Sequence, residues 1–200
     1  MKYDSFNHIM NDNLTKLPNN LPEPKDDGDA EHLLGMMIPN MVLQSNTDGL
    51  LDINSVDCEF MVLYFFPTMD ISGKLVSTKW NNIPGARGCT PQNISINENK
   101  KEFEKYNAIP IGISIQSIDE LIKISSIQGF SQLLLSDSGM EFQKKLQIPT
   151  FRFGNKTMYK RITLIVKNSE IIKVFYPVFP PDIHVFKILN WLKKNSTKLI

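Results

Sequence analysis

Apolar and polar residues alternate in blocks along this chain, and the blocks predict strands and helices in turn. The run Phe60–Phe66 reads FMVLYFF and is apolar at odd and even positions alike, which is typical of a central strand buried on both faces. Further strands are predicted at 41–43, 109–115, 132–135, 161–166 and 170–176. Helices are predicted after Cys89 and at 117–128, 140–146 and 184–194.

Turn and capping residues separate these blocks. The triplets Thr47-Asp48-Gly49 and Lys167-Asn168-Ser169 predict turns. Ser117 and Asp182 are expected to cap the helices that follow them. Strands that alternate with helices and end in a hairpin and a helix indicate an α/β domain whose mixed sheet is covered on both faces.

Two segments lack this periodicity. Residues 1–30 are rich in Asn, Asp and Pro, which predicts an N-terminal arm that is either mobile or laid over the domain. Residues 67–88 carry three glycines and predict a long loop, and long loops inside compact domains tend to be functional. We therefore expect one domain over residues 31–200, preceded by an arm.

The charge balance argues against polyanionic partners. The 200 residues include 22 Lys and Arg against 21 Asp and Glu, so no overall field would attract nucleic acid or an anionic membrane. The N-terminal segment MKYDSFNHIMNDNLTKLP lacks the apolar core of a secretion signal, and no later run has the length of a membrane span. These features favour a cytoplasmic protein with neither nucleic-acid nor membrane partners.

The two cysteines differ in their surroundings. Cys58 precedes an apolar strand and has no cationic neighbour, which favours a buried, unreactive side chain. Cys89 follows Gly88 at the expected start of a helix, with Arg87 two positions away. A helix N-terminus and a nearby cation both stabilise a thiolate, so the local sequence leaves Cys89 open to either a structural or a reactive role.

Three segments, in order, carry a family resemblance: YFFP, GARGCTPQ and RITLIVKNSEI. Together they resemble the peroxiredoxin family, in particular its Q (bacterioferritin-comigratory-protein) type, over about residues 35–192. The resemblance implies a thioredoxin-like fold and an antioxidant thiol-dependent hydroperoxide reductase that contributes to cell redox homeostasis. It also implies that no cofactor and no metal are needed.

The resemblance assigns roles to individual residues. The family motif Pro-x-x-x-Thr-x-x-Cys places the peroxidatic cysteine at Cys89, and Arg161 matches the distant arginine that completes the pocket. Gln92 stands where such proteins often carry a glutamate that orients this arginine. Gly88 and Arg87 are expected to support the thiolate, with the Gly88 and Cys89 amides as hydrogen-bond donors.

The chain departs from this motif at two points. Pro67 follows the strand as the motif proline should, but 21 residues instead of six lie between it and the cysteine, so about residues 68–85 form an insertion. The motif threonine falls on Ala86, which has no hydroxyl to bind a peroxide.

The implied reaction converts Cys89 to a sulfenic acid, which a second thiol must reduce. In two-cysteine relatives a resolving cysteine lies five residues after the peroxidatic one, where this chain has Ile94. Cys58 begins the strand whose opposite end leads to the site, too far for a disulfide. We therefore expect a one-cysteine mechanism with an external reductant of the thioredoxin, glutaredoxin or glutathione type; the preferred peroxide and a homodimer are left open.

A different class of function also fits: a non-catalytic redoxin-fold protein, for binding or redox sensing, in which the inserted loop presents Trp80 to a partner. Trp80 is expected either to cover the pocket or to anchor the loop. Arg152 is expected on the surface rather than in the site, and Phe151 and Phe153 in packing. The histidines at 8, 32 and 184 lie far apart in sequence, which argues against a metal or triad role and favours exposed or capping positions.

Overall fold

The computed structural model describes residues 15–47, 49–70 and 77–196. The strands are β1 (Val42–Ser45), β2 (Gly49–Asp52), β3 (Phe60–Phe65), β4 (Ala108–Ser114), β5 (Leu133–Ser136), β6 (Thr150–Phe153), β7 (Lys156–Tyr159), β8 (Ile162–Lys167) and β9 (Glu170–Phe175). The helices are η1 (Glu31–Leu33), η2 (Ile53–Ser55), α2 (Thr78–Asn81), α3 (Cys89–Glu98), α4 (Lys100–Glu104), α5 (Ile118–Gln128), α6 (Glu141–Leu146) and α7 (His184–Asn195).

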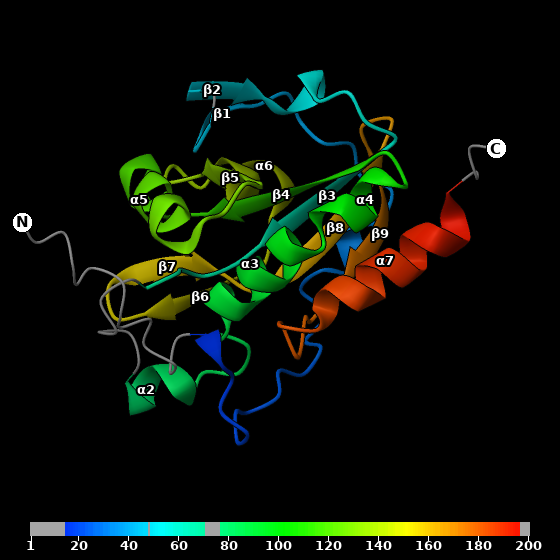
Figure 1. Cartoon of the computed structure of the whole chain (residues 1–200). Coiled ribbons are helices and arrows are strands. Elements are labelled where there is room, and N and C mark those ends of the chain that lie inside the picture. The colour runs from blue at the N-terminus through cyan, green and yellow to red at the C-terminus, as the bar shows by residue number, and fades with distance from the viewer. Residues whose placement is uncertain (1–14, 48, 71–76, 197–200) are drawn as a thin grey trace, which may run out of the picture.

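Seven strands form one mixed sheet in the order β2-β1-β5-β4-β3-β8-β9 (Figure 1). The central strand β3 runs parallel to β4 and antiparallel to β8. All six residues of β3 are buried, as its uninterrupted apolar run predicts. The β8–β9 turn uses Asn168 (φ 51°) and Ser169 (φ 64°), and two successive residues of positive φ fit the twist of a tight hairpin.

The two faces of the sheet have separate cores, as the alternation of side chains along β3 requires. Phe60, Val62 and Tyr64 point to the face covered by α3, α4, α5 and α7. Met61, Leu63 and Phe65 point to the face covered by α6, η1 and η2 (Figure 1). The prediction of a mixed sheet covered on both faces is therefore confirmed.

Most of the predicted elements lie where the pattern placed them, and the predicted Ser117 cap is confirmed. Ser117 Oγ accepts a hydrogen bond from the Glu120 amide, and the Glu120 carboxylate accepts one from the Ser117 amide. The predicted cap at Asp182 is wrong. Helix α7 begins one residue later than that cap would require, because Ile183 occupies the capping position, and Asp182 Oδ1 accepts only from the Ile183 amide.

The sequence pattern missed three strands and short helices, among them α2. Strand β2 pairs with β1 at the sheet edge, and β6 and β7 form a separate two-stranded sheet. Each of these strands has four residues, too short for a strong alternation signal. The predicted loop over 67–88 contains the short helix α2, opened by Ser77, whose Oγ accepts from the Trp80 amide.

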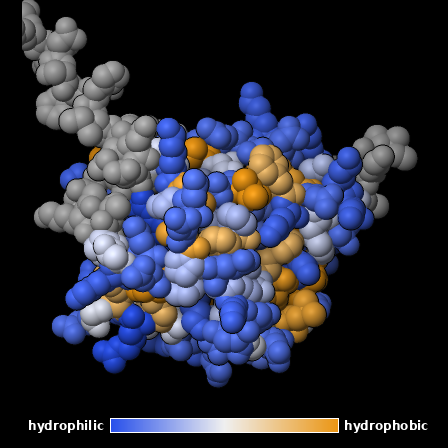
Figure 2. Space-filling model, turned by 90° about the horizontal axis from the view of Figure 1, so that it is seen from below, coloured by the Kyte–Doolittle hydropathy of each residue, from blue (hydrophilic) through white to orange (hydrophobic). Residues whose placement is uncertain are grey.

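The surface carries apolar side chains among the hydrophilic ones. Figure 2 shows hydrophobic residues in small groups separated by hydrophilic ones on the face seen from below. No helix in the described ranges is long and apolar enough to cross a bilayer.

Candidate active site

The register of β3 and β8 determines where the site forms. Phe65, at the end of β3, pairs with Ile162, at the start of β8. The chain that leaves β3 leads through the loop to α3, and Arg161 directly precedes β8. Arg161 and the start of α3 therefore meet at one edge of the sheet, although 72 positions separate Arg161 from Cys89.

Cys89 is the first residue of the ten-residue helix α3, and only 4% of its surface is exposed. Gly88 before it has φ 107°, a conformation that residues with a Cβ rarely adopt. The turn at Gly88 places the cysteine among first-turn amides that have no carbonyl partner within the helix. This end of the helix carries a partial positive charge next to the sulfur.

The guanidinium of Arg161 faces the sulfur. Arg161 Nη2 lies 3.2 Å from Cys89 Sγ, and Arg161 is 3% exposed. The group is fixed by the loop backbone: Nε donates to the Gly85 carbonyl at 3.3 Å, and Nη2 donates to the Ala86 carbonyl at 3.2 Å. Arg161 is thus oriented by the loop that carries the cysteine.

Arg161 Nη2 also donates to the Arg87 carbonyl at 3.4 Å, and Gln92 Oε1 accepts from Arg161 Nη1. None of the ion pairs of the described residues involves Arg161. A buried cation without a counter-ion is unfavourable, so the negative charge that Arg161 can acquire at close range is the thiolate of Cys89. Gln92 offers Arg161 a neutral amide and not a carboxylate, so this side chain does not neutralise the guanidinium.

A cavity of about 20 Å³ opens at the sulfur, lined by Cys89, Arg87, Asp70, Thr68 and Trp80 among others. A cavity of this size holds about one water molecule. Burial lowers the pKa of Arg87, and the negative charges of Cys89 and Asp70 oppose this shift. The cavity wall therefore combines a second guanidinium with a carboxylate.

Ala86 and Trp80 show how the departures from the motif are accommodated. Ala86 is 1% exposed and packs with Trp80 and Met158, so an apolar contact replaces the hydroxyl of the motif threonine. Trp80 packs edge-on against Phe153 with ring centroids 5.1 Å apart, and it is 3% exposed. Trp80 meets both expectations, since it anchors the loop against Phe153 and also lines the cavity at Cys89, and a buried indole cannot be presented to a partner.

A buried polar network behind the cysteine was missed in the sequence. Asn93 Nδ2 donates to the Cys89 carbonyl at 2.9 Å, Tyr64 Oη donates to Asn93 Oδ1 at 2.9 Å, and Gln132 Nε2 donates to the Asn93 carbonyl at 3.1 Å. The network ties α3 to β3 and to the start of β5. The only sequence signal was the spacing of Asn93, four residues after Cys89, which places an amide one helical turn from the cysteine.

Cys58 lies in a different environment. It is half-buried and packs against the core on the α6 face, whereas Cys89 belongs to the core on the α3 face. Burial, with the charge of Asp57, raises the pKa of the Cys58 thiol to about 11. Cys58 is therefore protonated at neutral pH and separated from Cys89 by the sheet.

The other sequence candidates are distributed as follows. Pro67 follows β3; its carbonyl accepts from Ser114 Oγ at 3.1 Å, and its neighbour Thr68 lines the cavity. Arg152 is exposed on β6, as expected. The expectation of an exposed or capping position is wrong for His184, which is 2% exposed. Its Nε2 forms a hydrogen bond with Thr163 Oγ1, which allows the polar ring to be buried.

Comparisons with known proteins support one assignment. No protein-family model matches the sequence. The peroxiredoxin Bcp of Bacillus subtilis is 24% identical over 169 residues, which cover 82% of this chain and 98% of that protein.

Two solved structures share the fold. The peroxidoxin BcpB of Mycobacterium tuberculosis superposes with a TM-score of 0.66 at 21% identity, over 82% of this chain and 98% of its own. Peroxiredoxin Q of Xanthomonas campestris superposes with a TM-score of 0.63 at 20% identity, over 78% and 92%. The thioredoxin-like fold is thereby established, and the sequence is similar to the peroxiredoxin of Bacillus subtilis over almost the whole length of that protein.

Proposed function

We propose that Cys89 is the peroxidatic residue and that it reduces hydrogen peroxide or an organic hydroperoxide by a one-cysteine mechanism. The observation that carries this proposal is the 3.2 Å contact between Cys89 Sγ and Arg161 Nη2 at the N-terminus of α3. Two independent sources of positive potential, the helix end and the guanidinium, act on the same sulfur.

The reaction follows from this geometry. The thiolate of Cys89 attacks one peroxide oxygen along the O–O axis, and an S–O bond forms as the O–O bond breaks. Negative charge moves to the departing oxygen, where Arg161, the first-turn amides of α3 and Arg87 can stabilise it. The departing oxygen takes up a proton as water or alcohol, and Cys89 is left as a sulfenic acid.

The geometry supports an external thiol as the reductant. Cys58 lies before β3, whereas Thr68 and Asp70, which line the cavity, lie after it. The six residues of β3 alone span about 20 Å, at about 3.3 Å per residue, while disulfide Cα atoms lie about 4.4 to 6.8 Å apart. In the resolving position of two-cysteine relatives, α3 carries Ile94.

A peroxide-consumption assay with dithiothreitol tests the role of Cys89. We expect Cys89→Ser to abolish turnover and the matched variant Cys58→Ser to retain it. Persistence of turnover in Cys89→Ser would exclude the proposed site.

Mass spectrometry of peroxide-treated protein tests the one-cysteine mechanism. Treatment with a sulfenic-acid-trapping dione is expected to give one adduct, on Cys89. A Cys58–Cys89 disulfide in the untrapped protein would show instead that Cys58 resolves the sulfenic acid.

A further inference from the structure

The N-terminal segment 17–29, here called the arm, lies on the outer side of the loop that carries Cys89. In Figure 1 it is the blue chain that passes beneath α3, between α2 and the start of α7. A Cβ built on Gly88 would meet Leu17 Cδ2 at 2.8 Å, which shows that Leu17 rests directly on this backbone. A Cβ on Gly85 would meet Pro24 Cγ at 3.3 Å.

The far end of the arm is fastened to the residue beside Arg161. Lys160 Nζ donates to Asp27 Oδ2 at 2.5 Å and to Asp29 Oδ2 at 2.7 Å. Tyr176 Oη donates to Asp27 Oδ1 at 2.6 Å. Burial opposes ionisation of Asp27, but the hydrogen bonds from Lys160 and Tyr176 outweigh it and lower the pKa of Asp27 to about 2. The carboxylate is therefore charged at neutral pH, and the fastening is ionic.

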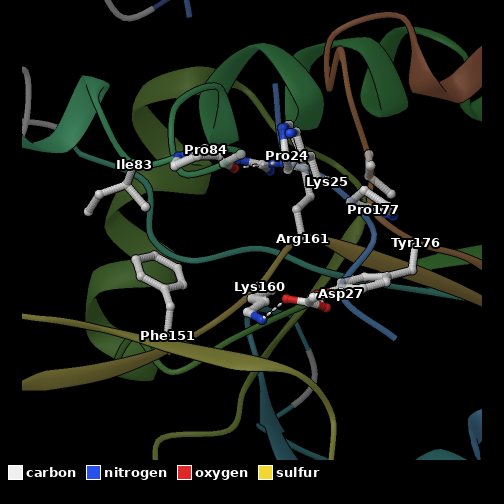
Figure 3. Close-up of a pocket in the computed structure, with 12 residues that line it drawn as sticks. Pro24, Lys25, Asp27, Ile83, Pro84, Phe151, Lys160, Arg161, Tyr176 and Pro177 are labelled. Carbon is white, nitrogen blue, oxygen red and sulfur yellow. Dashed lines mark hydrogen bonds and ion pairs between the residues drawn. The ribbon is translucent and has the colours of Figure 1, made fainter. Parts of the chain in front are cut away.

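Between these contacts the arm stands away from the domain. A cavity of about 380 Å³ lies under it, lined by Pro24, Asp27, Pro84, Phe151 and Tyr176 among others (Figure 3). The side chain of Arg161 also borders this cavity. The arm thus contacts the domain at Gly88, Gly85, Lys160 and Tyr176, and the cavity lies between these points.

Because Cys89 is buried, a peroxide and a reducing thiol need different degrees of access to its sulfur. A small peroxide needs only the sulfur, its fixed arginine and a cavity of molecular size. An external thiol must bring its own sulfur, with the atoms attached to it, to a residue that is 4% exposed beside a cavity of about 20 Å³. Since the cavity holds about one water molecule, the loop must move before the reductant can reach the sulfenic acid.

We propose that the arm is a clamp: fastened to Lys160, it holds the Cys89 loop in the arrangement that reacts with peroxide, and its release exposes the oxidised cysteine to the reducing thiol. This inference rests on the proposed function for its catalytic consequence. Ion pairs at the surface are weak and are screened by salt, so the clamp opens reversibly and opens more readily at high ionic strength.

The test compares Lys160→Gln with a matched control, Lys167→Gln, which removes the ion pair of Lys167 with Glu59 outside the arm. In a Cys58→Ser background, labelling of Cys89 by a bulky aromatic disulfide reports access to the sulfur without any peroxide. Loss of about 1 kcal/mol from the fastening, near the upper range for an exposed pair, corresponds to about fivefold faster labelling of Lys160→Gln. Lys167→Gln and Lys160→Arg are expected to label at the parent rate.

Single-turnover kinetics give the catalytic readout. Reduction of preformed sulfenic acid by dithiothreitol is expected to be about fivefold faster in Lys160→Gln, and insensitive to added salt. Oxidation by hydrogen peroxide is expected to remain within about twofold of the parent, because opening by about 1 kcal/mol leaves the closed state in the majority.

The outcomes separate the two proposals. Equal labelling rates in Lys160→Gln and Lys167→Gln would overturn the clamp. A loss of the rate of peroxide oxidation in Lys160→Gln as large as its gain in the rate of reduction would overturn it too. If the parent protein does not react with peroxide, the proposed function fails, and the labelling comparison still decides whether the arm controls access to Cys89.

Discussion

At the residue scale, the candidate site depends on the positive charge of Arg161, which belongs to no ion pair among the described residues. Arg161 is buried, its hydrogen-bond acceptors on the loop are carbonyl oxygens, and Gln92 contributes an amide rather than a carboxylate. The positive charge is therefore available to the sulfur of Cys89. Ala86 offers no hydroxyl, so in the proposed reaction the guanidinium and the amides must supply more of the stabilisation of the transition state.

Replacing Arg161 tests this dependence. We expect Arg161→Met to lower the rate constant for peroxide oxidation by about 10²- to 10³-fold, the usual effect of removing one transition-state donor. The thiolate fraction at neutral pH, followed by ultraviolet absorbance, should fall as well. Arg152→Met removes an exposed arginine from β6 and serves as the matched control, with both quantities unchanged.

At the element scale, the loop between β3 and α3, which the sequence predicts to hold an insertion, contributes side chains to the candidate site. Helix α2 carries Trp80, which packs against Phe151 and Phe153 of the small β6–β7 sheet while also lining the cavity at Cys89. The loop therefore uses a tryptophan and a hairpin to fix the backbone carbonyls that hold Arg161.

Trp80→Ala tests whether the packing of the loop affects the rate of peroxide oxidation. Truncating a buried tryptophan lowers the free energy of unfolding by about 3 kcal/mol, and the loosened loop should also slow peroxide oxidation. Trp191→Ala, in α7, removes a tryptophan that packs against Phe60 away from the cavity. Denaturant unfolding should show a loss of stability in both variants; equal peroxide rates in the two would contradict a role for Trp80 in positioning the loop.

At the scale of the whole molecule, the α3 face of the sheet holds a buried histidine that responds to pH. Burial lowers the pKa of His184 to about 3, and the charges of Lys187 and Arg161 add to the shift. An unfolded histidine titrates at about 6.5, so between these values the unfolded chain binds a proton that the folded chain does not. Stability therefore falls as the pH decreases from about 6.5 towards 3.

The expected slope is up to about 1.4 kcal/mol per pH unit, from one proton. Urea unfolding of the parent protein between pH 7 and 5 should show this slope in the free energy of unfolding. The range lies above most carboxylate titrations. His184→Gln should remove the slope, whereas His32→Gln, at an exposed residue, should retain it. A slope that survives in His184→Gln would show that another group binds the proton.

The sequence by itself determined the local elements and marked Cys89 as a candidate reactive residue, while the choice between a structural and a reactive role came from the family resemblance. The apolar run of β3 and the Ser117 cap are consequences of side-chain chemistry within a few residues, so they could be predicted. Gly88 and the helix after Cys89 are local in the same sense. The assignment of Arg161 came from the resemblance to a family, because nothing in its neighbourhood in the chain points to a cysteine 72 positions away.

The tertiary structure decided what lies around that cysteine. The pairing of β3 with β8 brings Arg161 to α3. The Tyr64–Asn93–Gln132 network joins β3, α3 and the residue before β5. The burial of Trp80 and of His184, and the place of the arm against Gly88, also depend on contacts between residues distant in sequence. Periodicity records which face a side chain takes within its own element, but it carries no information about which other element covers that face.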